Sequence, residues 1–317
     1  MKNTLIHNLI LKKYPNVVIY YFKIYNNNIM NIIITGSKGF LGKRIRRSLE
    51  EKGDTVFEYD IMDGYDICNK EQFKIFAIKN KCVLVIHLAA ISNLNIYQED
   101  INIGEKINIL GTKNILDICE ELKMRLLFAS TCCAYGNNNM HITDENSPTM
   151  TQEPYALSKL ESEKDILAIG LPHCCMRLAT FYGPEMRKEL APAIFLHNIY
   201  HDLPIDIHGT GTQTRTITYV DDIVSGIVTI AHTVPKYEII NITTNEANSV
   251  LNMITVAENI IGKKATKNYI LDREHQIYKQ IILSDRLQSL GWECKTNFVN
   301  GMEKSYDWFI NNDEKFI

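Results

Sequence analysis

The sequence predicts an α/β protein with a doubly wound parallel sheet and a smaller C-terminal α/β lobe. Two observations lead to this fold class. Short β-branched or apolar runs alternate with longer helical patterns through the first half of the chain, which is typical of βαβ units whose sheet is covered on both faces. The first run leads directly into three glycines at three-residue spacing, "TGSKGFLG" (35–42).

The expected elements follow in order along the chain. Strands are expected at residues 31–35, 55–60, 83–90, 125–130 and 173–179. Crossover helices are expected at 39–52 and 102–123, and the apolar face of the second would be supplied by Ile107, Leu110, Ile115, Leu116 and Ile118. After residue 180 the elements become shorter, although "TITYVDDIVSGIVTIA" (216–231) and "YEIINIT" (237–243) again indicate sheet and helix.

This rhythm predicts two domains and an N-terminal appendage. The first domain spans 30–180, and the chain returns to it at about 215–245, whereas the second lobe takes residues 181–214 and 246–317. The appendage is residues 1–29, and Met30 stands immediately before the isoleucine run. Two interpretations stay open, because Met30 could be the working start of translation or the preceding residues could form a short amphipathic arm.

The composition is that of an ordinary globular protein, with 45% hydrophobic and 22% charged residues in a chain of 317. A net charge of -3 gives no reason to expect a nucleic-acid partner. Lysines and a proline break the N-terminal apolar patches below membrane-spanning length, so no membrane partner is expected. The eight cysteines show no CxxC spacing, which favours a reducing, cytoplasmic setting and no metal site.

The glycine loop predicts a phosphate-bearing ligand on a Rossmann-type fold. A helix N-terminus directly after a strand presents unpaired backbone NH groups and the positive end of the helix dipole. Gly36 would make the turn, Gly39 would let a pyrophosphate reach the backbone, and Gly42 would let the helix pack on the sheet. A simple turn is the alternative interpretation of these glycines.

Acidic residues after the second strand extend this prediction. Asp60 ends that strand, where dinucleotide-binding folds place a carboxylate that accepts hydrogen bonds from the adenosine ribose. A carboxylate there repels a ribose 2'-phosphate, so the cofactor is expected to be NAD and not NADP. Asp66 follows in "GYDIC" and could meet the adenine or be a solvated loop acid.

A tyrosine and a lysine suggest proton transfer. Tyr155 and Lys159 stand four residues apart in "EPYALSKLESEK", which places both on one face of a helix. A nearby ammonium favours the phenolate, so the tyrosine could deprotonate an alcohol. Ser130 and Thr131 end the strand of "RLLFASTCCAYG", and a hydroxyl there could hold the same alcohol oxygen. A surface helix pair is the alternative for the tyrosine and lysine.

Seven motifs together resemble the extended short-chain dehydrogenase/reductase family, which comprises nucleotide-sugar epimerases and dehydratases. They are "TGSKGFLG", Asp60, "VIHLAA", "ASTCCAYG", "PYALSK", "MRLATFYGP" and "RTITYVDDI". Their order and spacing follow the family over roughly residues 30–310. The resemblance implies a Rossmann-type first domain, NAD as cofactor, a nucleotide-sugar substrate bound by the second lobe, and a homodimer formed by the helix from Asn102 and the helix carrying Tyr155.

The resemblance also implies roles for individual residues. The catalytic residues would be Thr131, Tyr155 and Lys159. The cofactor would be bound by Gly36, Gly39, Phe40, Leu41, Gly42, Asp60, Asp66, Ile67, Leu88, Ala89, Ala90, Tyr155 and Lys159. The substrate would be bound by Ser92, Thr131, Cys132, Thr180, Arg187, Arg215 and Arg273. Asn108 matches a family asparagine with a structural role.

The favoured reaction is epimerisation, most often at C4 of a nucleotide-linked hexose, by transient oxidation with Tyr155 as base. Family 4,6-dehydratases carry an acidic residue directly after the catalytic threonine, whereas this chain has Cys132 and Cys133 there. Three alternatives stay open. They are a 4,6-dehydratase, an epimerase/reductase of deoxysugar synthesis with Cys133 as acid, and a non-catalytic NAD-binding sensor or structural protein of the same fold.

Overall fold

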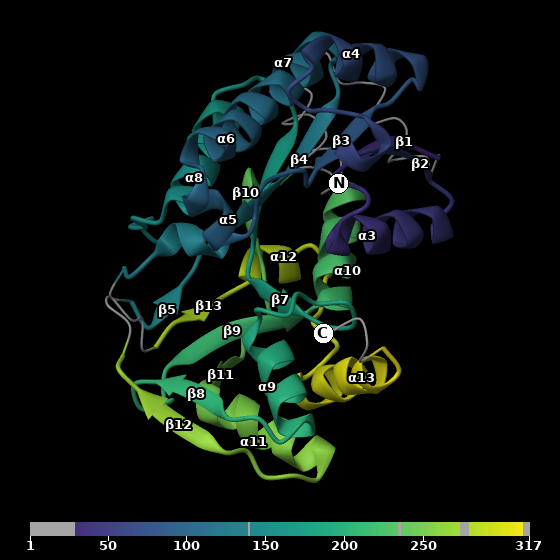
Figure 1. Ribbon diagram of the computed structural model, residues 1–317. Helices are drawn as coiled ribbons and strands as arrows, with labels where there is room; N and C mark the ends of the chain where they lie inside the picture. The colour runs from purple at the N-terminus through teal and green to yellow at the C-terminus, as the bar shows by residue number, and fades with distance from the viewer. Residues whose placement is uncertain (1–28, 139, 234–235, 273–278, 313–317) are drawn as a thin grey trace.

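A six-stranded parallel sheet forms the centre of the computed structural model, which describes residues 29–138, 140–233, 236–272 and 279–312 (Figure 1). Its strands lie in the order β10-β6-β4-β3-β1-β2. They span Asn31–Thr35 (β1), Thr55–Tyr59 (β2), Leu84–His87 (β3), Arg125–Thr131 (β4), His173–Leu178 (β6) and Ile239–Ile242 (β10). The direction of strand succession reverses at β1, which is the point where doubly wound sheets bind ligands. The predicted fold class is therefore confirmed.

Helices cover both faces of this sheet (Figure 1). On one face α3 (Phe40–Glu51) packs against α10 (Val220–Ala231), and on the other lie α4 (Lys70–Lys79), α7 (Thr112–Leu122) and α8 (Pro154–Leu167). Because both faces are covered, every residue of β3, β4 and β6 is buried. This explains why the strands are continuous apolar runs in the sequence.

The helix expected at 102–123 is three segments. A short α6 (Ile101–Glu105) is followed by a π-helical segment, Lys106–Gly111, and then by α7. The wide π turn rotates the following residues relative to a 3.6-residue period, so Asn108 is buried while Leu110 is 47% exposed. The expectation that Leu110 faces the core is therefore wrong, whereas Ile115, Leu116 and Ile118 are buried as expected.

Smaller sheets make up the rest of the molecule. A three-stranded sheet contains β7 (Thr180–Tyr182), β9 (Thr214–Tyr219) and β11 (Ala247–Ser249). Two strand pairs join β8 (Ile205–His208) with β12 (Lys267–Ile270), and β5 (Ile142–Thr143) with β13 (Ile281–Ile282). The remaining helices are α5 (Leu94–Glu99), α9 (Ala191–Tyr200), α11 (Val250–Ile261), α12 (Asp285–Gln288) and α13 (Phe298–Ile310).

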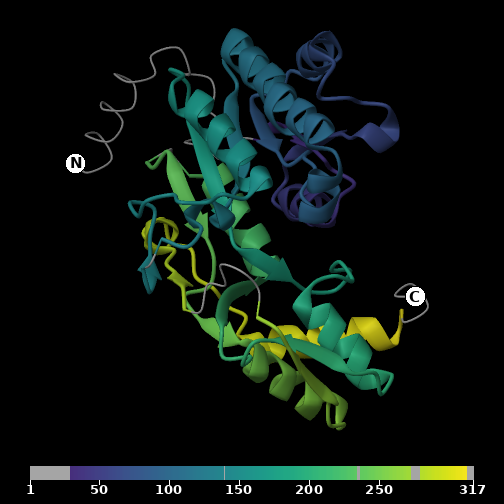
Figure 2. The ribbon, with the colours of Figure 1, turned by 60° about the vertical axis from the view of Figure 1, so that its left-hand side comes forward.

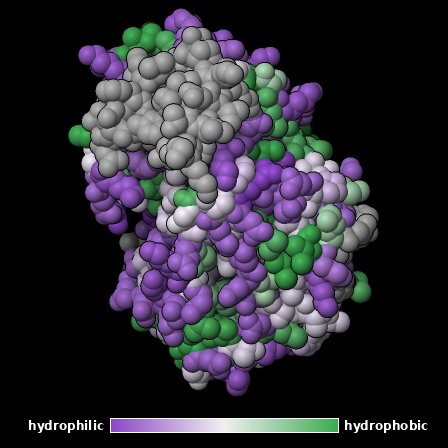
Figure 3. Space-filling view, turned by 180° about the vertical axis from the view of Figure 1, so that it is seen from behind, coloured by the Kyte–Doolittle hydropathy of each residue, from purple (hydrophilic) through white to green (hydrophobic). Residues whose placement is uncertain are grey.

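The two groups of elements meet at the carboxyl ends of the parallel strands. β6 ends at Leu178 and the chain enters β7 two residues later, so the smaller sheets begin where the central sheet ends (Figures 1 and 2). On the face seen in Figure 3, hydrophilic residues surround scattered apolar patches. Among the residues that the structure describes, no helix is both long and apolar enough to cross a bilayer.

Candidate active site

The glycine loop is a tight turn between β1 and α3. Gly36 has φ +69°, and a Cβ on it would lie 2.9 Å from the backbone nitrogen of Ala89. A Cβ on Gly42 would lie 2.4 Å from the carbonyl oxygen of Gly36, which is closer than real atoms approach. Only glycine fits at these two positions, because the loop, the helix and the segment after β3 are in direct backbone contact.

The start of α3 suits an anionic ligand. Gly39 is the N-cap residue and has no side chain that could accept a hydrogen bond. The first NH groups of the helix therefore lack a side-chain acceptor, and they lie at the positive end of the helix dipole. Beside it, the Ser37 hydroxyl is buried with no hydrogen-bond partner among the described residues. An orphaned donor beside a helix N-terminus fits the pyrophosphate of a dinucleotide. The next residue, Phe40, stacks on Phe181 at 5.7 Å, and Leu41 is buried.

Asp60 is fixed next to this loop. Its Oδ2 accepts a hydrogen bond from the backbone NH of Lys38 at 2.9 Å, and its Oδ1 accepts one from the NH of Met62 at 3.0 Å. The carboxylate thus lies at the end of β2 beside the glycine turn, where the ribose is expected. Asp66 is half-buried and accepts from the NH of Cys68, while Ile67 packs on Gly111.

A buried histidine organises the segment after β3. Thr35 Oγ1 accepts from the NH groups of Leu88 and Ala89 at 3.1 and 3.2 Å, so its own proton goes to His87 Nδ1 at 2.6 Å. His87 Nε2 then donates to Thr112 Oγ1 at 2.9 Å, and Thr112 donates to the Asn108 carbonyl at 2.7 Å. Burial lowers the pKa of His87 to about 3, so this imidazole is neutral. Because the segment is a loop, the strand expected at 83–90 ends at His87.

Asn108 pins the following residues. Its Oδ1 accepts from the Ile91 NH at 2.8 Å and its Nδ2 donates to the Ile91 carbonyl at 3.0 Å. The same side chain reaches Ser158 on α8 at 3.4 Å. The loop that contains Ala90 and Ser92 is thus tied to the helix that carries the tyrosine and lysine.

Tyr155 and Lys159 lie on the first two turns of α8. Glu153 caps this helix by accepting from the NH groups of Tyr155 and Ala156. The Lys159 side chain is buried under the sheet, with Nζ 4.7 Å from the centre of the Phe128 ring and 6.0 Å from that of Tyr155. Burial lowers the pKa of Lys159 to about 7, although the charge of Glu163 opposes this effect.

The surroundings of Tyr155 pull its pKa in both directions. Burial is the largest effect and raises the pKa, as do the charges of Cys133 and Glu153. Arg187 and a hydrogen bond with Thr131 lower it. The structure therefore brings Thr131, at the end of β4, and Arg187, from the smaller lobe, to the phenol of Tyr155.

The two adjacent cysteines point in different directions. Cys132 is buried in a small cluster with Tyr135, and its Sγ donates to the carbonyl of Arg177 at 3.2 Å. Cys133 is exposed on the side of Thr131 and Tyr155. The structure thus turns the Cys132 side chain away from the predicted substrate site and presents Cys133 in its place.

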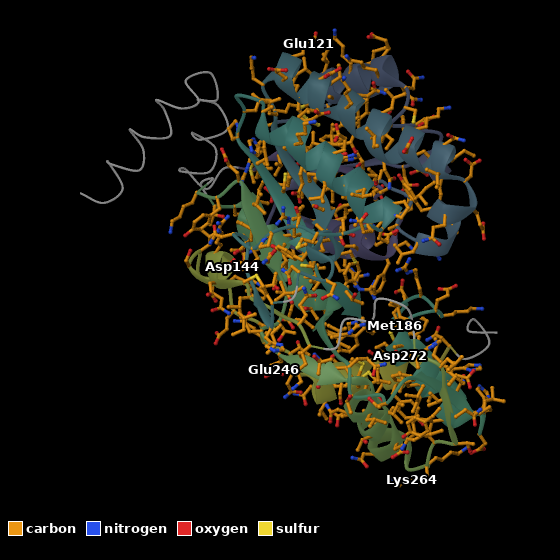
Figure 4. All side chains as sticks on the ribbon, turned by 90° about the vertical axis from the view of Figure 1, so that its left-hand side faces the viewer. Glu121, Asp144, Met186, Glu246, Lys264 and Asp272 are labelled. Atoms are coloured by element: carbon orange, nitrogen blue, oxygen red, sulfur yellow. The ribbon has the colours of Figure 1, made fainter. Side chains whose placement is uncertain are left out.

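The other predicted substrate residues come from several loops. Arg187 Nη1 makes a long hydrogen bond of 3.5 Å to the Ser92 carbonyl, and its neighbour Met186 lies where the two lobes meet (Figure 4). Arg215 donates to the Thr214 carbonyl, and its charge acts on the Cys133 thiol. Thr180 is exposed at the start of β7. Arg273 lies outside the described residues.

Sequence reasoning missed a buried ion pair behind the site. Glu163 accepts from Arg177 Nε at 3.0 Å and from Nη2 at 2.6 Å, and the Ser130 hydroxyl donates to the same carboxylate at 2.5 Å. Glu163 lies four residues after Lys159 on one face of α8, a spacing that could have drawn attention to it. Its partner on β6 could not have been found from the helix alone.

A parallel sheet with a glycine turn, an acid after β2 and a tyrosine and lysine below the end of β4 defines a dinucleotide-dependent enzyme of the Rossmann class. The chain matches the model of the "NAD dependent epimerase/dehydratase family" over residues 32–243, more than half of its length, and it belongs to that family. The predicted resemblance is thereby confirmed, as is the dependence on NAD.

Similar proteins include both epimerases and dehydratases. The chain is 30% identical to the UDP-glucuronate 4-epimerase of Thermodesulfobacterium geofontis, over 89% of this chain and 97% of that protein. It is 27% identical to the dTDP-D-glucose 4,6-dehydratase of Bos taurus, over 80% and 75%. The solved UDP-glucuronic acid 4-epimerase from Bacillus cereus, in complex with UDP-glucuronic acid and NAD, superposes with a TM-score of 0.80 at 26% identity, covering 89% of this chain and 99% of that one.

Proposed function

We propose that this protein is an NAD-dependent 4-epimerase of a UDP-linked sugar, with Tyr155 as the base. One observation carries the proposal: Tyr155, Thr131 and Lys159 lie together at the carboxyl end of β4, and the two residues that follow Thr131 are cysteines and not carboxylates. The full-length match to a 4-epimerase supports it.

The residues at this site divide the work of a reversible oxidation. Bound NAD supplies the hydride acceptor at C4 of the sugar. Tyr155 takes the proton of the C4 hydroxyl and later returns it, while Thr131 holds that oxygen by a hydrogen bond. The buried charge of Lys159 stabilises the phenolate, because an ammonium acts more strongly where water is excluded. No further acid is needed when the keto-sugar turns over and is reduced on its other face.

The cofactor would lie across the carboxyl ends of the strands. Gly36, Gly39 and Gly42, with Phe40 and Leu41, would hold the pyrophosphate, and Asp60 would hold the ribose. Asp66 and Ile67 would border the adenine, and Leu88, Ala89 and Ala90 would border the middle of the cofactor. The tightness of the glycine turn against Ala89 supports this placement.

Elimination of water is less well supported by the side chains present. Cys132 is buried away from Tyr155, and Cys133 carries a thiol, which is a much weaker acid than a carboxyl group. The carboxylate of Glu153, whose charge reaches Tyr155, is engaged by two backbone NH groups of α8. The dehydratase relatives nevertheless make a test of product mass necessary.

Arg187 supports a hexuronate as the sugar, with a neutral hexose as the alternative. Its charge acts on Tyr155, and its guanidinium forms the long hydrogen bond with the Ser92 carbonyl. In the described part of the chain no carboxylate forms an ion pair with it. A sugar carboxylate near the reacting carbon would supply the missing counter-charge, while Thr180 and Arg215 would lie along the rest of the substrate.

The direct test incubates the purified protein with NAD and a panel of UDP-glucuronate, UDP-glucose and dTDP-glucose, followed by NMR. We expect a product of unchanged mass inverted at C4, formed fastest from UDP-glucuronate, and no turnover by Tyr155→Phe. Loss of one water would contradict the proposal. A net reduction that consumes NADPH would indicate an epimerase/reductase, and NAD binding without conversion of any sugar would indicate a sensor.

We further propose a homodimer that works in the cytoplasm. Ile103, Leu110 and Leu157 are large apolar residues with about half of their surface exposed, on the adjoining α6, π-helical and α8 segments. Exposed apolar residues on neighbouring helices favour an interface. The eight cysteines all lie in the described part of the chain and form no disulfide with one another there, which supports a reducing compartment. Light scattering of the wild type and of Leu157→Glu would test the dimer.

A further inference from the structure

A cluster of charges surrounds the ribose-side carboxylate. Lys38, in the middle of the glycine loop, donates its backbone NH to Asp60. Its side chain extends toward the end of β2, where Nζ lies 3.2 Å from Glu58 Oε1 and 3.3 Å from Asp63 Oδ2. Arg46 Nε approaches the same Glu58 oxygen at 3.7 Å. The ammonium is therefore bracketed by two carboxylates that flank Asp60 in the sequence.

These two ion pairs neutralise the Lys38 ammonium at a position where a free cation would influence the choice of cofactor. NAD and NADP differ by a phosphate on the adenosine ribose, at the position read by the acid after the second strand, and NADP enzymes place a basic side chain there. A lysine in the glycine loop could serve as a phosphate partner as a point charge. Here both carboxylates already neutralise it, and their hydrogen bonds raise the pKa of Lys38 above its ordinary value.

We propose that Glu58 and Asp63 are cofactor-selectivity residues: by holding Lys38 they deny a 2'-phosphate its counter-ion, and so they add to the exclusion of NADP by Asp60. The inference rests on the proposed position of the adenosine ribose at Asp60. It goes beyond the charge of Asp60 itself, since it assigns selectivity to two side chains that need not touch the cofactor.

Direct binding tests the proposal without any turnover. The ratio of the dissociation constants for NADP and NAD is measured by calorimetry for the wild type and for Glu58→Gln/Asp63→Asn. Because the double variant frees Lys38, we expect this ratio to fall by about tenfold, mainly through tighter NADP binding. Adding Lys38→Gln to the double variant should restore the ratio, since the released cation is then gone.

A matched control separates this effect from a change in net charge. Asp117→Asn/Glu121→Gln makes the same two substitutions in the pairs Lys70–Asp117 and Lys74–Glu121, at 2.7 and 2.6 Å on α4 and α7. Glu121 lies at the outer end of the upper lobe (Figure 4). The control should leave the ratio as in the wild type.

Three results from these variants would overturn the proposal, and a fourth comes from Asp60 itself. The three are an unchanged ratio in the double variant, an equal fall in the matched control, and a fall that persists without Lys38. Asp63 is an exposed residue, with 41% of its side-chain surface accessible, so Asp63→Asn alone should fold normally. If the double variant is unstable, this single variant should lower the ratio by about threefold. Asp60→Asn tests the underlying assumption that the adenosine ribose lies at Asp60. If it leaves NAD affinity unchanged, the ribose does not lie at Asp60 and the proposal fails, while the epimerase assignment is judged separately by turnover.

Discussion

Arg177 and Glu163 form a bidentate ion pair that connects the carboxyl end of β6 to α8. Both side chains are buried, with Nε–Oε1 at 3.0 Å and Nη2–Oε2 at 2.6 Å. The Ser130 hydroxyl, on the last residue but one of β4, also donates a hydrogen bond to the Glu163 carboxylate. The charge of Glu163 in addition opposes the loss of the Lys159 proton.

Removing the charge of Glu163 is expected to be costly. Glu163→Gln leaves the Arg177 guanidinium buried without a counter-ion, which should lower the free energy of unfolding by about 3–5 kcal/mol. The pKa of Lys159 should also fall, so activity at neutral pH should drop. Chemical denaturation and the pH dependence of turnover measure the two effects. Glu161→Gln, an exposed position on the same helix, serves as control, and equal stability of the two variants would contradict the prediction.

Replacing Lys159 should stabilise the protein and inactivate it. The folded-state pKa of about 7 lies below the ordinary 10.5, so between these values the unfolded chain binds the proton more tightly. Stability contributed by the neutral amine is therefore present above pH 10.5 and is lost as the pH falls through 7. At pH 7, Lys159→Met should raise the free energy of unfolding by at least about 1 kcal/mol and lower turnover by about 100-fold or more.

Thermal melts between pH 6 and pH 10 check this prediction. The wild type should gain stability relative to Lys159→Met as the pH rises, because the cost of holding a buried ammonium then disappears. Parallel curves for the two proteins would show that Lys159 does not titrate in this range.

Gly42→Ala should disable the cofactor loop. The added Cβ would lie 2.4 Å from the Gly36 carbonyl oxygen and 2.7 Å from Ser37 Cα, and neither backbone atom can yield cheaply. We expect NAD affinity to fall by about tenfold or more, measured by calorimetry. Gly170→Ala is the matched control, because nothing lies within 4 Å of its added methyl group, and it should bind NAD normally. Wild-type affinity in Gly42→Ala would contradict the tight turn.

Arg187→Gln should change the preference among sugars. If the guanidinium neutralises a sugar carboxylate, kcat/KM for UDP-glucuronate should fall by about tenfold to 100-fold, while that for UDP-glucose changes little. The comparison of two substrates within one variant controls for damage to the site. An equal loss for both substrates would indicate that Arg187 acts on Tyr155 and not on the sugar.

The local parts of the site could be predicted from the sequence, and the parts built across elements could not. The glycine turn, Asp60, Tyr155 and Lys159 depend on short motifs within one strand, turn or helix. The pairing of Glu163 with Arg177 depends on how α8 is placed against β6, which no motif encodes. Leu110 was misplaced because the π turn changes the helical phase, and a periodicity argument assumes that the phase is constant.

The orientation of the two cysteines shows a further limit. Adjacent residues after a strand end leave by opposite sides, and the 3-10 turn Cys132–Tyr135 decides which side each takes. The sequence indicated that a small side chain follows Thr131, but it did not indicate which thiol would face Tyr155.

The π-helical turn at Asn108 has a mechanical consequence. Its side chain forms two hydrogen bonds with the backbone of Ile91, while its carbonyl oxygen accepts hydrogen bonds from the hydroxyls of Thr112 and Ser162. The loop after β3, the neutral His87 and α8 are therefore all connected through the single residue Asn108. A one-residue deletion between Lys106 and Gly111 would restore a regular helical phase, turn Asn108 away from Ile91 and break these connections together.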